Sequence, residues 1–218
     1  EDKEFLGGVA LLSADADKIK EYVFESAKLP EIRGGSMILD GLNQGWPDDE
    51  GENIRKLFAH KGFSVERGNK DSCIIYAGGG SLLALVPRVA AEELQQEIEA
   101  LYPHETGVAT ITCVVSQPVS AEEVLANFDD LMARQSLLLR RAKEEKDPLP
   151  FFEAIPPARR CQSCGIRPAF TVETAPELRW LCWPCKRKVE RSDKQKWVDD
   201  FVAELLDGKL DCEPQSYL

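Results

Sequence analysis

The sequence predicts an α+β protein, in which a sheet carries helices on one face and is followed by a small four-cysteine module and a C-terminal helix. Three observations support this prediction. Short apolar or alternating segments, typical of strands, are separated by segments with the apolar spacing of helices. A charged and proline-rich segment at 143–157 marks a domain boundary. Two Cys-x2-Cys pairs lie beyond that boundary.

The first part of the chain predicts one strand and three helices. The apolar run GGVALLS has no alternation, as in a central buried strand. Asp17 is suited to cap the helix that follows, and Ser36 to cap the next one. Pro30 and a glycine pair favour a loop between these helices. The predicted elements are a strand at 7–13, a helix at 14–27, a loop at 28–36, and helices at 36–46 and 52–62.

The next part predicts a hairpin, a helix, an alternating strand and a long helix. Ser120 and Glu123 form a capping box at the start of that long helix. The predicted elements are strands at 64–77 and 81–87, a helix at 89–101, a strand at 107–117 and a helix from 120. The order β-α-α-β-β-α-β-α is typical of a ferredoxin-like or palm-type sheet.

These elements predict three units, at 1–150, 151–190 and 191–218. The third holds a helix at 193–209 whose apolar stripe is Trp197, Phe201 and Leu205. The stripe packs either on the core of this chain or on a partner. Because the chain has no initiator methionine and ends abruptly, we expect it to be a fragment of a longer protein with a truncated tail.

Composition and charge exclude several classes of protein. The 218 residues contain no apolar run near the length of a membrane span and no secretion signal, so we expect a cytoplasmic protein without membrane contact. The net charge of −11 argues against a general nucleic-acid binder. From Arg159 to Lys196, however, ten basic and four acidic residues give +6. This basic segment is either a local binding surface or a solvated face.

Four of the seven cysteines have the spacing of a zinc ribbon: Cys161, Cys164, Cys182 and Cys185. Each Cys-x2-Cys loop aims two thiolates at one point, and two loops complete a tetrahedron around Zn2+. Four thiolates leave no open coordination position, so the predicted site is structural. The metal then either holds together a fold with a very small core or supports a nucleic-acid-binding module.

The two strands of the predicted hairpin are joined by Gly78, Gly79, Gly80 and Ser81. In a palm-type sheet, two Mg2+ ions for nucleotidyl transfer need carboxylates both from the end of the first strand and from this turn. Here Asp15 and Asp17 supply the first group, and the turn supplies no acid. The glycines either let the backbone approach a phosphate or only permit positive φ angles in a wide hairpin.

At this point the sequence resembles a known family. The segments LLSADADKIKEYVFESAKLPEIRGGSMILDGLN and CIIYAGGGSLLALVP, with the cysteine module, resemble a Palm domain and zinc ribbon. These belong to the large signalling subunit of type III CRISPR effector complexes, whose hairpin is similar to that of GGDEF-type cyclases. The family has two Palm domains that together hold two ATP molecules and make cyclic oligoadenylates. Because Gly80 and Ser81 replace the acids of the Gly-Gly-Asp-Asp turn, this chain resembles the non-catalytic Palm.

The resemblance implies ATP as a ligand, Zn2+ in the ribbon and Mg2+ in the intact protein. Its implied partners are a second Palm domain of the same protein, other effector subunits, and guide and target RNA. It implies no catalytic residue in this chain, and the two histidines, His60 and His104, form no nuclease motif. The predicted nucleotide-binding residues are Asp15, Asp17, Arg33, Ser36, Gly78, Gly79, Gly80 and Ser81. The alternative is an architectural, RNA-contacting module without nucleotide binding; an independent cyclase is disfavoured by the missing acids.

Overall fold

The computed structural model describes residues 8–46, 51–66, 72–146, 158–173 and 178–194. Its main sheet has four antiparallel strands in the order β2-β3-β1-β4. These strands are β1 (Val9–Asp17), β2 (Ile74–Gly78), β3 (Ser81–Pro87) and β4 (Thr110–Val115). A strand order of 2-3-1-4 with helical crossovers is that of a ferredoxin-like sheet, so the predicted fold class is confirmed.

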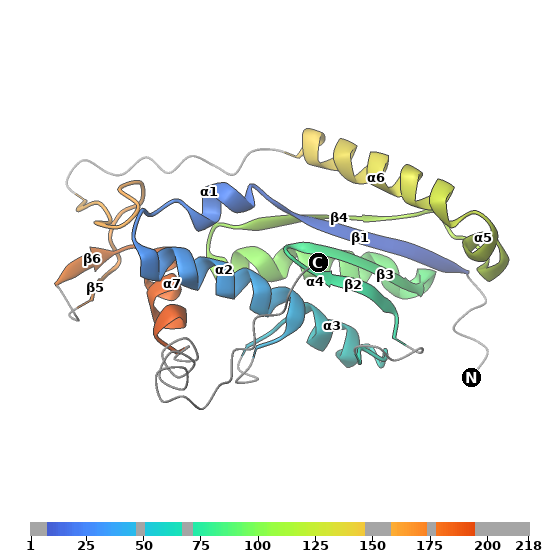
Figure 1. Ribbon diagram of the computed structural model, residues 1–218, viewed down its shortest axis with the longest axis horizontal. Coiled ribbons are helices and arrows are strands. Elements are labelled where there is room, and N and C mark those ends of the chain that lie inside the picture. Colours follow the sequence, from blue (N-terminus) through green and yellow to red (C-terminus); the bar gives the residue numbers. More distant parts are fainter. Residues whose placement is uncertain (1–7, 47–50, 67–71, 147–157, 174–177, 195–218) are drawn as a thin grey trace, which may run out of the picture.

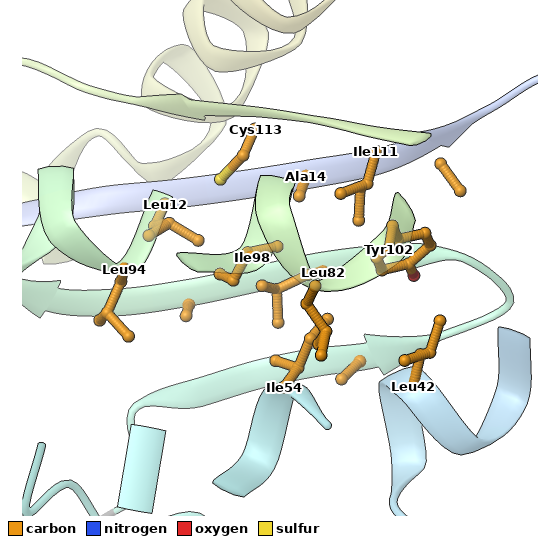
Figure 2. Close-up of a cluster of buried hydrophobic side chains, with 14 of the residues drawn as sticks. Leu12, Ala14, Leu42, Ile54, Leu82, Leu94, Ile98, Tyr102, Ile111 and Cys113 are labelled. Atoms are coloured by element: carbon orange, nitrogen blue, oxygen red, sulfur yellow. The ribbon is translucent and has the colours of Figure 1, made fainter. Parts of the chain in front are cut away.

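Helices α2 (Leu29–Gln44), α3 (Ile54–His60) and α4 (Arg88–Thr106) pack against one face of the sheet (Figure 1). The core lies between them, and alternate β1 residues such as Leu12 and Ala14 point into it (Figure 2). A short helix, α1 (Ile19–Val23), links β1 to α2. Within the described residues, no helix is both long and apolar enough to cross a bilayer.

The predicted long helix is two helices, α5 (Ala121–Ala126) and α6 (Phe128–Glu145), which meet at Asn127. The Ser120 cap is confirmed, because its side chain accepts a hydrogen bond from the Glu123 amide at 3.1 Å. Helix α6 packs on β1 and β4 (Figure 1), where its Leu131 and Gln135 are buried. Side chains alternate along a strand, so Leu11 points away from the core that its neighbours Ala10 and Leu12 face. Leu11 is nevertheless buried, because α6 covers this opposite face of the sheet.

The predicted loop at 28–36 is wrong, because these residues form the first half of α2. Pro30 lies in the first helical turn, where a missing amide proton costs nothing. The glycine pair is inside the helix because another helix, α7 (Trp183–Lys194), packs closely against it. A Cβ at Gly34 would overlap the carbonyl group of Lys188. Tertiary packing therefore outweighs the low helix propensity of glycine.

Two predicted caps are also wrong. Ser36 lies inside α2, and the residue before α1 is Lys18, which has a positive φ of 50° and provides no side-chain cap. Asp17 instead ends β1, which continues four residues beyond the predicted strand. The predicted C-terminal helix at 193–209 lies almost wholly outside the described residues.

Candidate nucleotide and metal sites

The structure places Asp15 directly beside the glycine turn. Asp15 and Ser81 are opposite each other in the register of β1 and β3, and the Ser81 hydroxyl donates to Asp15 Oδ1 at 2.7 Å. The Ala16 amide donates to the Gly80 carbonyl at 2.8 Å. Five of the predicted nucleotide-binding residues therefore lie together: Asp15, Gly78, Gly79, Gly80 and Ser81.

The turn is tighter than the wide hairpin that the sequence left open as one explanation of the glycines. Gly78 pairs with Ser81, so the loop consists of Gly79 and Gly80 alone. Their φ angles are +59° and +88°, and two-residue hairpin loops of type I′ need positive φ at both positions. At Gly80 a Cβ would also collide with the Ile19 side chain. The backbone conformation thus accounts for both glycines, and ligand contact by them stays a prediction.

Arg33 and Ser36 are not brought to the turn. Both lie in α2, whose C-terminal Gln44 donates to the Ala77 carbonyl beside the turn at 2.5 Å. Ser36 precedes Gln44 by eight residues, which is about 12 Å along a helix axis. Their predicted role in nucleotide binding therefore depends on the family resemblance alone.

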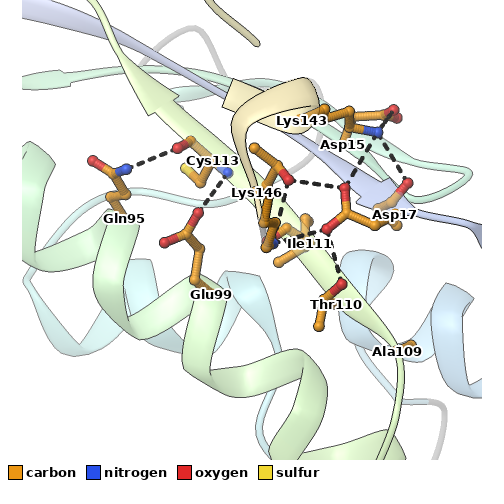
Figure 3. A network of polar contacts seen from close by, with 12 residues as sticks. Asp15, Asp17, Gln95, Glu99, Ala109, Thr110, Ile111, Cys113, Lys143 and Lys146 are labelled. Atoms are coloured by element: carbon orange, nitrogen blue, oxygen red, sulfur yellow. Dashed lines mark hydrogen bonds and ion pairs between the residues drawn. The ribbon is translucent and has the colours of Figure 1, made fainter. Parts of the chain in front are cut away.

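Sequence reasoning missed two lysines that complete the site. Lys143 and Lys146, at the C-terminal end of α6, extend over the end of β1 (Figure 3). The Lys143 ammonium donates to Asp15 Oδ2 and lies 3.6 Å from Asp17 Oδ1, and Lys146 Nζ donates to Asp17 Oδ2 at 2.8 Å. Two positive charges of this chain therefore contact the carboxylates that a pair of metal ions would need as ligands. The signal in the sequence was two lysines three residues apart on one helix.

Asp17 is held more firmly than Asp15. Thr110 and Thr112 of β4 donate their hydroxyls to its two carboxylate oxygens at 2.9 and 2.8 Å. Burial alone would raise the pKa of Asp17, but hydrogen bonds from Lys146, Thr112 and Thr110 and the charge of Lys146 outweigh it and lower this pKa below the usual 3.8. The carboxylate is thus ionised and occupied by partners of this chain.

The lowered pKa predicts how stability changes with pH. A carboxyl group whose pKa is lower in the folded state stabilises that state above its unfolded value, and loses this effect as the pH falls through the folded value. We expect Asp17→Asn to cost on the order of 1 kcal/mol at pH 7. Urea unfolding should show the difference from wild type shrinking as the pH falls below about 4, through the lowered pKa of Asp17. A difference that stays constant with pH would contradict this account of Asp17.

The four cysteines of the predicted ribbon lie together, with every pair of sulfur atoms within 4.8 Å. Tetrahedral Zn–S bonds of about 2.3 Å place neighbouring sulfurs about 3.8 Å apart. The distance between the sulfurs of Cys164 and Cys182 is 3.8 Å, so the donor set fits Zn2+. Among the described residues, no other group of three or more Cys, His, Asp or Glu side chains lies close enough to share an ion.

Two different local structures aim these thiols. Gly165 has a φ of +70°, its amide donates to the Cys161 carbonyl at 3.0 Å, and the Ser163 amide points at the Cys161 sulfur at 3.4 Å. The second pair lies at the start of α7, a helix that the sequence prediction missed. Amide groups in a tight turn and the positive end of a helix both favour thiolates over thiols.

The thiols cannot all ionise without a cation. Hydrogen bonds from Cys164, Cys182 and Cys185 lower the pKa of Cys161, whereas hydrogen bonds to the other three cysteines raise the pKa of Cys185. Because the sulfurs are so close together, Cys161 loses its proton easily whereas Cys185 keeps its own. A divalent cation removes this conflict, because four thiolates around Zn2+ carry a formal charge of only −2.

The cysteine module lies at one end of the sheet domain (Figure 1), and charged contacts join the two. Glu31, which is fully buried in α2, accepts from Arg179 Nη1 at 2.7 Å and from the Ser163 hydroxyl at 2.6 Å. Arg167 pairs with Glu25 at 2.6 Å. Arg187 pairs with Glu105 at 2.7 Å. Three carboxylates of the sheet domain thus neutralise three arginines of the module.

Lys188 of α7 is fully buried in the same contact. Its ammonium donates to the Tyr22 carbonyl, lies 3.9 Å from the centre of the Tyr22 ring and 3.6 Å from Glu25 Oε2. Burial lowers the pKa of Lys188, although the charge of Glu25 opposes this. Much of the basic charge that the sequence placed in the module therefore serves to dock it on the acidic sheet domain.

Comparisons with known proteins find similarity to solved structures. No protein-family model and no curated protein matches the chain. A Csm1–Csm4 subcomplex of the type III-A CRISPR-Csm interference complex is 18% identical, with a TM-score of 0.48 over 64% of this chain and 19% of that chain. A Csm1–Csm4 cassette in complex with AMPPNP gives the same values. Csm1 of T. onnurineus is 13% identical, with a TM-score of 0.46 over 82% of this chain and 24% of that chain.

The chain thus spans about a fifth of the length of the first of these structures. At these identities and TM-scores the likeness carries no argument about activity. What the fold and the site define by themselves is a class: a ferredoxin-like α+β domain with a docked module whose four clustered cysteines could hold a metal ion.

Proposed function

We propose that this chain is the acid-poor Palm domain and zinc ribbon of the large subunit of a type III CRISPR effector complex. In this proposal, residues 1–150 form the Palm domain, 151–190 the ribbon and 191–218 a further helix and tail. The Palm domain binds one ATP at the glycine turn and the Asp15 edge, and contributes that surface to cyclic oligoadenylate synthesis by the intact protein. The ribbon holds Zn2+ in a structural role.

One observation carries the nucleotide-binding part: the glycine turn lies against Asp15 with the Lys143 and Lys146 ammonium groups beside it. Triphosphates need positive charge and backbone amides, and both are available at this edge. A side-chain-free turn of two glycines also lets phosphate oxygens approach the backbone. When ATP binds, the ammonium groups of Lys143 and Lys146 either leave the carboxylates for the phosphates or contact both.

The same geometry supports the absence of catalysis by this chain alone. A two-metal mechanism needs carboxylates that bridge two ions about 3.5–4 Å apart. Here Asp17 is occupied by two threonines and Lys146, and Asp15 by Ser81 and Lys143. The turn itself offers a serine hydroxyl in place of a second carboxylate. Mg2+ would therefore enter with ATP and be held in the intact protein by residues of a second Palm domain.

The assignment to a CRISPR effector rests on the segments that resemble the family and on the cysteine module that follows the Palm-type fold. The structures named above contain Csm1, two of them with Csm4 and one also with AMPPNP. Csm4 and AMPPNP are components of those structures and not of this chain. For this chain we propose a second Palm domain, other effector subunits, and guide and target RNA as partners within the complex, in the cytoplasm.

Nucleotide binding is tested by titrating the full chain with ATP by calorimetry. We expect one ATP per chain, and we expect Lys143→Ala combined with Lys146→Ala to weaken binding about 10-fold or more, because hydrogen bonds to charged groups contribute about 1.5–3 kcal/mol. Arg140→Ala combined with Arg141→Ala is the matched control, since it removes two charges from exposed positions of the same helix. Circular dichroism should show that both variants are folded.

Two results would contradict the proposal. If ATP does not bind at millimolar concentration while RNA does, the architectural alternative is favoured. If the chain alone makes oligoadenylates from ATP with Mg2+ or Mn2+, the turn does not have the deficit of carboxylates that we assign to it.

A further inference from the structure

The β-hairpin of the cysteine module has two unlike faces. Strands β5 (Thr171–Glu173) and β6 (Arg179–Leu181) pair so that Val172 lies opposite Trp180 and Thr171 opposite Leu181. Leu181 packs with the cysteines, and Arg179 reaches Glu31. This inner face is therefore fully used by the metal centre and by docking on α2.

The outer face is apolar, aromatic and exposed. Side chains alternate along a strand, so Phe170 and Leu178 extend the face that Val172 and Trp180 begin. Phe170 continues the pairing, because its amide donates to the Leu181 carbonyl at 2.8 Å. Phe170 and Leu178 are 74% and 67% exposed, and Val172 and Trp180 are half-buried. We call Phe170, Val172, Leu178 and Trp180 the ribbon face.

Arg159 brings positive charge to this face, and Arg160 follows it in the chain. The guanidinium of Arg159 is 4.6 Å from the centre of the Trp180 ring, in a cation-π contact. Arg159 and the adjacent Arg160 are exposed. In the described part of the chain, neither forms an ion pair with a carboxylate, whereas Arg167, Arg179 and Arg187 each do. One of these two exposed arginines, Arg159, therefore lies directly against an aromatic ring of the ribbon face.

We propose that the ribbon face, with Arg159 and Arg160, binds single-stranded nucleic acid. Bases stack on Phe170 and on the Arg159–Trp180 pair, and backbone phosphates pair with the two arginines. Exposed aromatic rings beside unpaired arginines are the combination that stacking platforms for single strands use. A purely apolar partner would leave both arginines without counter-charges, whereas a nucleic acid supplies them.

The position of the hairpin suits this role. It projects from the end of the molecule opposite α5 (Figure 1), and its inner face is anchored by Leu181 among the cysteines and by the contact of Arg179 with Glu31. A rigid platform presents its rings without an entropic cost of ordering them. The glycine turn lies elsewhere, on the edge of the main sheet, so this inference does not depend on nucleotide binding there.

Fluorescence anisotropy with a short unstructured RNA, and with DNA of the same sequence, tests the proposal on the full chain without nucleotide. We expect binding to one or both strands and a loss of about 10-fold in affinity for Phe170→Ala, because base stacking contributes about 1–3 kcal/mol. Phe24→Ala is the matched control, since Phe24 is exposed to a similar degree on a different part of the chain.

Salt dependence tests the arginines. Arg159→Ala combined with Arg160→Ala should reduce the slope of log affinity against log salt by about 1.4, since each phosphate contact to a single strand contributes about 0.7. The Arg140 and Arg141 double variant should leave the slope unchanged. ATP titration of Phe170→Ala should match wild type, which separates this surface from the glycine turn.

The proposal is overturned if the wild-type chain binds neither oligonucleotide, which would make the ribbon face a protein contact. It is also overturned if Phe170→Ala and Phe24→Ala bind equally well, since the contact would then be electrostatic without stacking.

Discussion

Removal of the metal is expected to unfold the cysteine module and to destabilise the whole described fold. The module has a small core of its own, centred on the cysteines, Leu181 and Val189. Structural Zn2+ sites contribute apparent binding free energies of about 10–16 kcal/mol, which is folding free energy when no site exists in the unfolded chain. Because α7 packs on α2, the loss should reach the sheet domain.

The measurement is thermal unfolding of the full chain before and after treatment with a strong chelator, with zinc content determined by mass spectrometry. We expect about one Zn2+ per chain and a clear fall in the midpoint when it is removed. Cys161→Ser should reproduce this result, and Cys73→Ser, outside the cluster, should bind zinc normally. A chain free of metal that melts at the unchanged temperature would exclude a structural metal site.

The second large effect is expected from Glu31→Gln. Glu31 is fully buried between Arg179 and Ser163, so the substitution leaves the charge of Arg179 without its partner. Removing one member of a buried ion pair costs about 3–5 kcal/mol. Urea unfolding should show this loss, whereas Glu144→Gln, in an exposed pair with Arg140, should change stability by less than about 0.5 kcal/mol.

A double variant separates the ion pair from general packing. Replacing Glu31 with Leu and Arg179 with Met together removes both charges, and such replacements are often neutral or stabilising. We expect it to recover most of the stability lost in Glu31→Gln. If Glu31→Gln is as stable as wild type, the module is not held on α2 by this contact.

Local patterns predicted the sheet and the proximity of the four cysteines, although β2 is shorter than the strand predicted at 64–77. The hairpin strands, the capping box at Ser120 and the two Cys-x2-Cys pairs each depend on residues close together in the sequence. The proximity of Asp15 to the turn also followed, because a palm-type strand order makes β1 and β3 neighbours. These features needed no knowledge of distant packing.

The features that were missed depend on contacts between distant segments. The glycines at 34 and 35 suggested a loop, yet they lie in α2 because α7 approaches there. Lys143 and Lys146 reach aspartates more than 125 residues earlier in the chain. A count of charges in the sequence likewise could not identify the acidic partners of the module's arginines. It indicated a basic segment, whereas in the structure three of its arginines pair with carboxylates of the sheet domain.

The docking interface also indicates what the cysteine module does in this fold. Its inner face stabilises α2 and α1 through Glu31, Glu25 and Lys188. Helix α1 follows directly after Asp15 and Asp17 in the chain. The module therefore supports the segment that carries the candidate nucleotide site, which agrees with the structural role proposed for a metal bound by its cysteines.

The most direct test of the central claim is a crystal structure of this chain with a non-hydrolysable ATP analogue and Mn2+, in which anomalous scattering locates the ions. The account predicts phosphates at the Gly79–Gly80 turn, in contact with Lys143 and Lys146, and no pair of ions bridged by Asp15 and Asp17. Two manganese ions held between these carboxylates would contradict it. So would the absence of nucleotide at the turn in a crystal soaked with a saturating concentration of the analogue.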